Sequence, residues 1–306
     1  MNVLVTGGAG FIGKYLVKFL LEKENSVTIF DNFSNSSEKS INFLSEMGAK
    51  IVKGDIMNIK DLENVIKNHD TIIHLAAQIS VLESIKNPDK TFQTNVEGTN
   101  NVLSMCKKNF VKKIIIASSA AVYGESSQDN QLKEESSMEP ISPYGESKMK
   151  MEQNIIKFTS NNKIDFVILR FFNIYGIGQS PEYAGVITKF LKNIINDESL
   201  KIFGDGLQTR DFVAIHDVIQ SIYNALIYNK NGIFNIASGK KITIKELAKQ
   251  MIILSRRTLE IQFLAEKQGD IRYSQANIER SKNQIAYSPK WELKEGIKEL
   301  LQSNFN

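Results

Sequence analysis

The feature that most constrains this chain is a glycine-rich turn directly after its first hydrophobic run. Residues 3–5 form a short apolar run typical of a buried parallel strand, and the sequence TGGAGFIG follows at residues 6–13. Gly7, Gly10 and Gly13 stand three residues apart in it, and apolar residues then recur at helical spacing. The glycines therefore lie between a strand and a helix. Such a turn lets a ligand approach the backbone, and the helix N-terminus favours a pyrophosphate.

The second apolar strand supports a dinucleotide as that ligand. It covers residues 26–32 and carries Asp31 at its carboxyl end. An acidic residue about 20 positions after such glycines accepts hydrogen bonds from ribose hydroxyls and repels a 2′-phosphate. The two features predict a dinucleotide-binding turn that prefers NAD to NADP. The alternatives are a tight turn without a ligand and an aspartate that only caps a turn.

Composition limits the classes of protein that remain. The chain has 306 residues, enough for two lobes, and a formal net charge of +4 with acids and bases interspersed. That balance suits a phosphate-bearing substrate and does not indicate a nucleic-acid-binding surface. Cys106 is the only cysteine, so an internal disulfide is excluded and a reducing compartment fits. We expect no leader peptide, no membrane span, no metal site and a cytoplasmic location.

Strands and helices alternate through the first half of the chain. The expected strands are 2–6, 26–31, 50–53, 71–75, 113–117 and 164–170, and the expected helices are 12–23, 36–46, 60–68, 92–109 and 144–161. Alternation of this kind predicts an α/β protein with a Rossmann-type, doubly wound parallel sheet. We expect residues 1–172 to form this domain, with residues 211–238 returning to it. Residues 173–306 should form mainly a smaller, interleaved substrate-binding lobe.

A second motif carries the residues for catalysis. Ser118 and Ser119 follow the fifth strand, and Tyr144 and Lys148 lie four residues apart on one face of a predicted helix. A phenol has a pKa near 10, and an adjacent ammonium stabilises its phenolate. The phenolate is then a base for a sugar hydroxyl, and a serine hydroxyl can bind the reacting oxygen. The alternative for both serines is capping of the strand end.

These motifs together resemble a known family. In chain order, TGGAGFIG, DNFSNS, GDI, LAAQ, TNVEGT, SSAAVYG, SPYGESK, RFFNIYG and GDGLQTRDFV are similar to the extended short-chain dehydrogenases/reductases, and most of all to their nucleotide-sugar 4-epimerases. The resemblance covers nearly the whole chain. It implies that NAD removes hydride from C4 of a hexose and returns it to the other face of a 4-keto sugar. It also implies a homodimer built from the helices at residues 91–108 and 144–158.

The resemblance assigns a role to individual residues. Tyr144 is implied as the base, Lys148 as the residue that binds the nicotinamide ribose and lowers the pKa of Tyr144, and Ser119 as support for proton transfer. The residues expected to contact NAD are Gly7, Gly10, Phe11, Ile12, Gly13, Asp31, Asn32, Asn35, Ser36, Asp55, Ile56, Leu75, Ala76, Ala77, Gln78, Asn95, Tyr144 and Lys148. The residues expected to contact a UDP-sugar are Ser80, Ser118, Ser119, Tyr144, Asn173, Val186, Phe203, Arg210, Lys267, Asp270 and Ser274.

Several of these assignments have alternatives. Val186 and Phe203 fit either the uracil pocket or the core. Arg210 fits either the diphosphate or a surface ion pair with Asp211 or Asp217. Lys267 stands where the family usually has arginine. A lysine can neutralise a phosphate but lacks the bidentate fork of arginine, so we expect weaker or altered diphosphate binding. An ungapped match places Ser274 beside the C2 substituent of the sugar, where a small residue admits an N-acetyl group. A slip of one residue would place Tyr273 there and reverse that prediction.

Three other functions compete with 4-epimerisation of a hexose. Related 4,6-dehydratases carry an acidic pair directly after the serine or threonine. This chain has Ala120 and Ala121 there, with no acid to expel water, which argues against dehydration. Relatives that epimerise or decarboxylate uronates need a cation for the sugar carboxylate, and none can be placed from the sequence, so they remain the main alternative. A non-catalytic NAD-binding scaffold is disfavoured because Tyr144 and Lys148 are both present.

Overall fold

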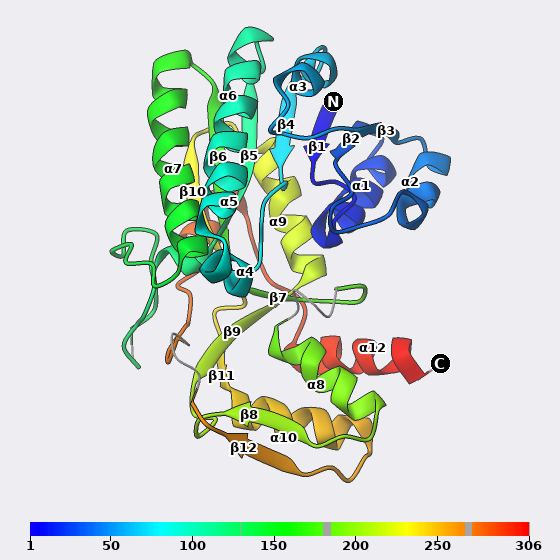
Figure 1. Cartoon of the computed structure of the whole chain (residues 1–306), viewed down its shortest axis with the longest axis vertical. Coiled ribbons are helices and arrows are strands. Elements are labelled where there is room, and N and C mark those ends of the chain that lie inside the picture. The colour runs from blue at the N-terminus through cyan, green and yellow to red at the C-terminus, as the bar shows by residue number, and fades with distance from the viewer. Residues whose placement is uncertain (129, 180–184, 267–270, 306) are drawn as a thin grey trace. The chain divides into compact units, whose positions relative to one another are not determined.

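The computed structural model describes residues 1–128, 130–179, 185–266 and 271–305, which form two compact units (Figure 1). The first unit consists of residues 1–122, 140–170 and 219–234. The second consists of residues 123–139, 171–218 and 235–306. Both units are therefore assembled from segments that are far apart in the sequence.

A seven-stranded sheet forms the centre of the first unit. Its strands, in spatial order, are β10 (Gly232–Ile236), β6 (Asp165–Phe171), β5 (Lys113–Ser119), β4 (Thr71–His74), β1 (Asn2–Thr6), β2 (Ser26–Asp31) and β3 (Lys50–Lys53). The pairs β1–β2, β1–β4, β2–β3 and β4–β5 are parallel. From β1 the chain adds β2 and β3 on one side of the sheet, and β4, β5 and β6 follow on the other side. Parallel sheets of this kind bind ligands at the carboxyl ends of the strands, at the point where the strand order switches sides, which here lies between β1 and β4. The predicted Rossmann-type fold is confirmed.

Helices cover this sheet, and local signals explain where several of them begin. Ser142 caps α7 by accepting a hydrogen bond from the Gly145 amide at 3.1 Å, and Pro143 occupies the first turn. Asn58 and Ser80 cap α3 and α4 in the same way. The helices and helical turns are α1 (Phe11–Glu22), η1 (Glu38–Ile41), α2 (Asn42–Glu46), α3 (Ile59–Ile66), α4 (Val81–Lys86), α5 (Pro88–Phe92), η2 (Gln93–Glu97), α6 (Gly98–Lys108), η3 (Ala120–Val122), α7 (Pro143–Asn162) and α9 (Ile215–Ile227).

Two predicted helices differ from the observed ones. The helix expected over residues 36–46 is a 3₁₀ turn, η1, followed by the short α2. The helix expected over residues 92–109 is interrupted by η2, a π-helical turn between α5 and α6. Apolar periodicity does not reveal such a turn because it adds only a local change in hydrogen bonding. The buried Asn95 lies in it.

Strand interiors and helix faces supply the core of the first unit. Leu4, Ile72, Ile114 and Ile116 on the strands pack in one cluster with residues of α3, α6 and α7. Cys106 is fully buried in this cluster, and burial raises the pKa of its thiol to about 12. The core thus holds β1, β4 and β5 in register, with their carboxyl ends at one edge.

Among the described residues, the second unit contains two small sheets and four helices. β7 (Asn173–Tyr175) runs parallel to β9 (Thr209–Ala214), which pairs antiparallel with β11 (Lys241–Thr243), and β8 (Leu200–Phe203) runs parallel to β12 (Ile261–Leu264). The helices are α8 (Val186–Ile195), α10 (Ile244–Ser255), α11 (Glu279–Ile285) and α12 (Leu293–Phe305). The apolar faces of α8, α10 and α12 form a separate core around Phe190, Leu247 and Met251.

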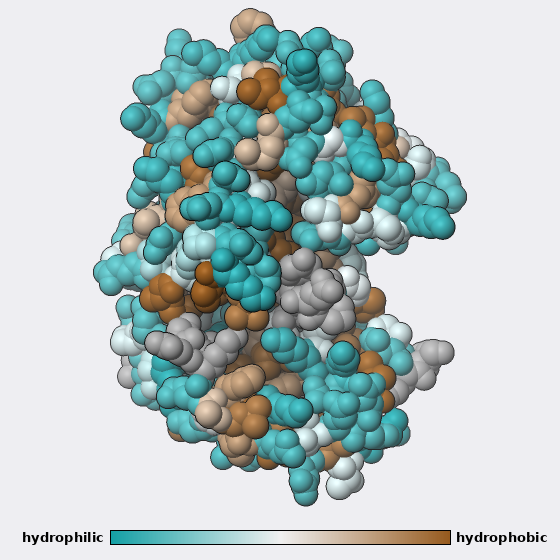
Figure 2. All heavy atoms as spheres, in the orientation of Figure 1, coloured by the Kyte–Doolittle hydropathy of each residue, from teal (hydrophilic) through white to brown (hydrophobic). Residues whose placement is uncertain are grey.

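Hydrophilic residues predominate on the face drawn in Figure 2, and apolar residues occur there in small groups. Among the described residues, no helix is both long and apolar enough to cross a membrane.

Candidate active site

The glycine turn lies where the sheet order reverses, and its backbone leaves no room for side chains. Gly7 has a φ of +71°, and a Cβ there would lie 2.6 Å from the Ala76 amide nitrogen. A Cβ on Gly13 would lie 2.5 Å from the Gly7 carbonyl oxygen. Gly10 is the N-cap of α1, and the first bond of that helix runs from the Lys14 amide to its carbonyl. The preceding amides of Phe11, Ile12 and Gly13 belong to the first turn, which binds anions.

Asp31 stands beside this turn at the end of β2. Its carboxylate accepts hydrogen bonds from the Ala9 amide at 3.0 Å and the Phe33 amide at 2.8 Å. Burial raises the pKa of Asp31, and these two amides oppose that increase. The carboxylate thus ties the glycine turn to the end of β2, in the position expected of a ribose acceptor.

The adjacent loops form a hydrogen-bonded rim at the carboxyl ends of β2 and β3. The side-chain amide of Asn32 donates to the Asp55 carboxylate at 2.9 Å. Asp55 also accepts from the backbone amide of Met57 at 2.8 Å. Ile56 is only 5% exposed and belongs to the core cluster. Asn35 is exposed and Ser36 half-buried in the loop that follows β2.

The loop after β4 is fixed by Asn95. Its side chain accepts from the Gln78 amide at 2.8 Å and donates to the Gln78 carbonyl at 3.0 Å. It also donates to the Ser147 hydroxyl on α7 at 2.9 Å. Asn95 is 1% exposed, so its described bonds position the loop formed by Leu75, Ala76, Ala77 and Gln78 against α7. A direct contact of Asn95 with NAD stays a prediction.

The predicted catalytic residues meet at the carboxyl end of β5. The Ser119 hydroxyl is hydrogen-bonded to the phenol of Tyr144 and accepts from the Ala121 amide at 3.1 Å. The Lys148 ammonium donates to the Ala117 carbonyl at 2.9 Å. Tyr144 and Lys148 are one turn apart on α7, as predicted. The structure therefore brings a phenol, a hydroxyl and an ammonium together beside the loop after β4.

The electrostatic surroundings of these groups differ in part from the sequence prediction. Burial raises the pKa of Tyr144, and its hydrogen bond with Ser119 opposes the increase. Burial lowers the pKa of Lys148 to about 8, although the charge of Glu152 opposes that decrease. The protein alone therefore does not show the lowered Tyr144 pKa that the resemblance implies, because desolvation dominates. A positively charged nicotinamide, when NAD is bound, would stabilise the phenolate of Tyr144 further.

These features fit a bound dinucleotide. The backbone at Gly7 and Gly13 forms a cradle that any Cβ would fill, the first turn of α1 faces the same edge as Asp31, and the small Ala76 lies against Gly7. The turn would hold the pyrophosphate and Asp31 the adenosine ribose. NAD, when bound, supplies a reversible hydride acceptor.

The second unit carries the other residues predicted to bind substrate. Phe203 ends β8 and is 44% exposed, which excludes the core position considered as its alternative. Val186 begins α8 and packs, half-buried, against the core of the unit. Asn173 donates to the Asp211 carbonyl at 3.1 Å, and Arg210 donates to the Thr209 carbonyl at 2.8 Å.

The carboxylates considered as ion-pair partners of Arg210 have other described donors. Asp211 accepts from Ser238, Gly239 and Ala276, and Asp217 accepts from the amides of Lys290 and Trp291. Burial raises the pKa of Asp211 to about 6, although these hydrogen bonds oppose the increase.

The structure describes part of the stretch expected to line the sugar. Ser274 is 7% exposed, and Tyr273 is half-buried with its amide donating to Glu125 at 3.0 Å. Lys267 and Asp270 lie outside the described residues. Of the substrate-binding candidates in the first unit, Ser80 caps α4. Ser118 is buried, and its hydroxyl donates a hydrogen bond to the Glu152 carboxylate at 2.5 Å.

Sequence reasoning missed Glu152 and Arg170, which form a buried ion pair behind the catalytic residues. The Arg170 guanidinium donates to both oxygens of Glu152, with the shortest bond 2.6 Å long. The spacing of Glu152, four residues after Lys148, was a usable signal because it puts both side chains on one helix face. The ion pair of Glu152 with Arg170 on β6 is a tertiary contact, and no local pattern in the sequence indicates it.

Fold and site together define an NAD-binding enzyme of the extended short-chain dehydrogenase/reductase type. Residues 3–237 match the NAD dependent epimerase/dehydratase family, and the chain belongs to that family. It is an epimerase that uses NAD.

Three solved structures show the range of similar proteins. A UDP-N-acetylglucosamine 4-epimerase from Methanobrevibacter ruminantium, in complex with UDP-N-acetylmuramic acid, is 36% identical over 98% of this chain and 97% of its own, with a TM-score of 0.92. A UDP-glucose 4-epimerase from Thermotoga maritima is 32% identical over 99% and 98%, with a TM-score of 0.94. A UDP-glucuronic acid 4-epimerase from Bacillus cereus, solved with UDP-glucuronic acid and NAD, is 31% identical over 100% and 99%, with a TM-score of 0.93.

Proposed function

We propose that this chain interconverts the C4 epimers of UDP-hexoses, with both N-acetylated and plain sugars as substrates. The observation that carries the proposal is the hydrogen bond between Ser119 and Tyr144 at the end of β5, with Lys148 one helical turn away. Similar proteins named as UDP-N-acetylglucosamine and UDP-glucose 4-epimerases support the substrate class.

Each side chain has a defined part in the proposed reaction. The phenolate of Tyr144 takes the proton from the hydroxyl on C4 and later gives it back to the carbonyl oxygen there. Ser119 donates a hydrogen bond to that oxygen, and the ammonium of Lys148 stabilises the phenolate. The proton and the C4 hydrogen are both restored, so only the configuration at C4 changes.

Ser274 supports acceptance of an N-acetyl group. Its side chain is small and nearly buried, and the resemblance to the family implies a position beside the C2 substituent of the sugar. Asn173, Arg210 and the exposed Phe203 are the proposed contacts to the nucleoside diphosphate. Lys267 and Asp270 complete this proposed set.

Proton NMR without added NAD tests the function. UDP-N-acetylglucosamine, UDP-glucose and UDP-glucuronic acid are incubated separately with the protein, and the anomeric signals of both epimers are followed. We expect the first two sugars to convert. Conversion of UDP-glucose alone would assign the pocket wall to Tyr273, and conversion of the uronate alone would overturn the proposed hexose specificity.

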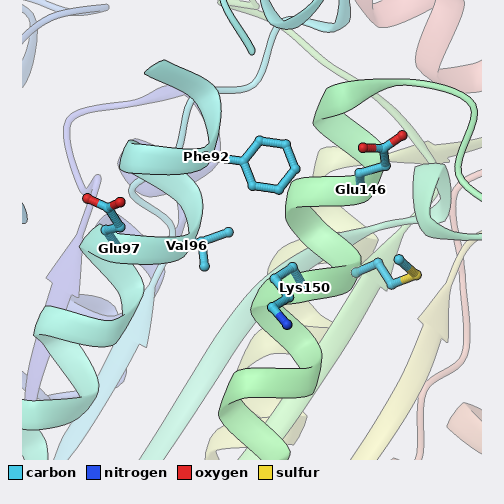
Figure 3. Close-up of a pocket in the computed structure, with 6 residues that line it drawn as sticks. Phe92, Val96, Glu97, Glu146 and Lys150 are labelled. Carbon is cyan, nitrogen blue, oxygen red and sulfur yellow. The ribbon is translucent and has the colours of Figure 1, made fainter. Parts of the chain in front are cut away.

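We also propose a homodimer formed through α5, α6 and α7. Residues of α5, η2 and α7 line a pocket of about 380 Å³ on the first unit. Figure 3 shows Phe92 and Val96 on one side of it and α7, with Lys150, on the other, and Met149 also lines the pocket. Glu97, Glu146 and Lys150 also line the pocket, so charges of both signs are available to a second copy. Light scattering at micromolar concentration should give twice the chain mass of 34.5 kDa, and a monomer mass would refute the dimer.

A further inference from the structure

Three successive contacts join α7 to the carboxyl end of β5, and we call them the α7–β5 ladder. The ladder consists of Tyr144 with Ser119, Lys148 with Ala117 and Glu152 with Ser118. The three helix residues are spaced by four, so they lie on one face of α7. The three strand residues are consecutive. Glu152 therefore belongs to the same set of contacts as the two residues proposed to carry the chemistry.

Glu152 is held from its other side by Arg170 on β6. Both side chains are almost fully buried, with exposures of 0% and 2%. A buried ion pair contributes little net stability, because removing two charges from water offsets most of their attraction. Apolar residues of similar size would fill this position at least as well. The pair therefore calls for an explanation beyond packing.

The surroundings of Lys148 provide that explanation. Lys148 is buried, and its hydrogen bond to the Ala117 carbonyl supplies no negative charge. Among the described residues, Glu152 on α7 and His74 on β4 are titratable groups that interact with it, and Tyr144 lies one turn away on the same helix. Burial keeps His74 neutral, with a pKa of about 3, so it carries no compensating charge. Glu152 is the carboxylate that opposes the loss of the Lys148 proton.

We propose that Glu152 is a positioning residue for the epimerase reaction: its carboxylate, oriented by Arg170, keeps Lys148 charged and fixes the end of β5 through Ser118. The proposal rests on the proposed function, because the charge of Lys148 matters only if Tyr144 acts as the base. A merely structural Glu152 would affect stability and nothing else.

The variant Glu152→Gln tests the charge, since glutamine can still accept from Ser118. We expect the loss of kcat at alkaline pH to move about one pH unit lower, with kcat at pH 8.5 reduced about tenfold. KM should change less than twofold. In protein without NAD, the rise in unfolding free energy as Lys148 becomes neutral should also begin about one pH unit lower.

The matched control is Lys113→Met, at the opposite end of β5. Lys113 is also buried and hydrogen-bonded, so its loss should lower Tm, but it has no contact with the ladder among the described bonds. Its pH profile should equal that of the wild type. A Glu152→Gln protein that loses Tm as this control does, with an unshifted profile, would overturn the proposal.

Ser118→Ala provides a second test that leaves all charges in place. Removing only the Ser118 contact should lower kcat about tenfold at every pH without moving the profile, because it loosens the strand end that carries Ser119. Wild-type kcat in Ser118→Ala would contradict the strand-fixing role. If the wild type converts no UDP-hexose, the proposed function fails instead, and the two failures are thereby separated.

Discussion

A buried lysine lies at each end of β5, and the two lysines have different surroundings. Lys113 belongs to the strand, whereas Lys148 belongs to α7 and contacts the other end of the strand. At the start of the strand, Lys113 donates to the carbonyls of Ala225, Leu226 and Tyr228, which end α9. At the other end, Lys148 has one carbonyl, one carboxylate and a phenol around it. Burial lowers the pKa of both lysines.

This comparison shows that burial of a lysine does not by itself identify a catalytic site. Three carbonyl oxygens saturate the three donors of the Lys113 ammonium, so that its function is to cap the helix. Lys148 keeps donors beyond its described bond to Ala117 and lies beside a base and a hydroxyl. The partners of a buried lysine, more than its degree of burial, distinguish a structural role from a catalytic one.

The largest expected effect is on Tyr144, at the catalytic end. Tyr144→Phe should lower kcat at least about 10³-fold, because phenylalanine cannot accept the substrate proton. Tm should change little, since only the bond to Ser119 is lost. Epimerisation in Tyr144→Phe above one-hundredth of the wild-type rate would refute the assignment of the base.

Methionine variants of each lysine test this contrast directly. Lys148→Met should lower kcat about 10²-fold or more, through loss of the charge that stabilises the phenolate. Lys113→Met should leave kcat unchanged but lower the free energy of unfolding by about 2–4 kcal/mol, because buried carbonyls lose their donor. Steady-state kinetics and urea unfolding of both variants measure the contrast. Equal effects on kcat would contradict it.

Acid stability adds a test through His74, on the strand beside β5. Burial, and then the charge of Lys148, lowers the pKa of His74 to about 3, below the unfolded value of 6.5. The unfolded chain therefore binds the proton first, so stability falls by about 2 kcal/mol between pH 7 and pH 5. Urea unfolding should show a smaller fall in His74→Gln. In Lys113→Met the fall should be unchanged.

A further effect concerns stability at alkaline pH. The pKa of Lys148 in the folded protein, about 8, lies below its ordinary value of 10.5, so the unfolded chain binds more protons between these limits. Stability should consequently rise with pH by up to about 1.4 kcal/mol per unit in that window. The contribution is absent from Lys148→Met, and an unchanged slope of unfolding free energy against pH in this variant would contradict a buried, charged Lys148.

Local patterns in the sequence were enough for most of the fold. Apolar runs located β1 to β6, and the glycine spacing located the turn before α1, because strand burial and backbone sterics are local properties. The π-helical turn at Asn95 was not predictable, since its side-chain bonds reach Gln78 and Ser147 in other elements. Tyr144, Lys148 and Ser119 were found through their spacing. Arg170 was not, because its contact with Glu152 exists only after α7 packs on β6.

The most direct test of the central claim follows deuterium at C4 of the sugar. UDP-N-acetylglucosamine labelled with deuterium at C4 is incubated with the protein in ordinary water, and the epimeric product is analysed by NMR. We expect the product to retain the label, because the C4 hydrogen leaves as a hydride while Tyr144 handles only the hydroxyl proton. Replacement of the deuterium by solvent hydrogen would show that C4 is deprotonated instead and would contradict the roles assigned to the residues at the end of β5.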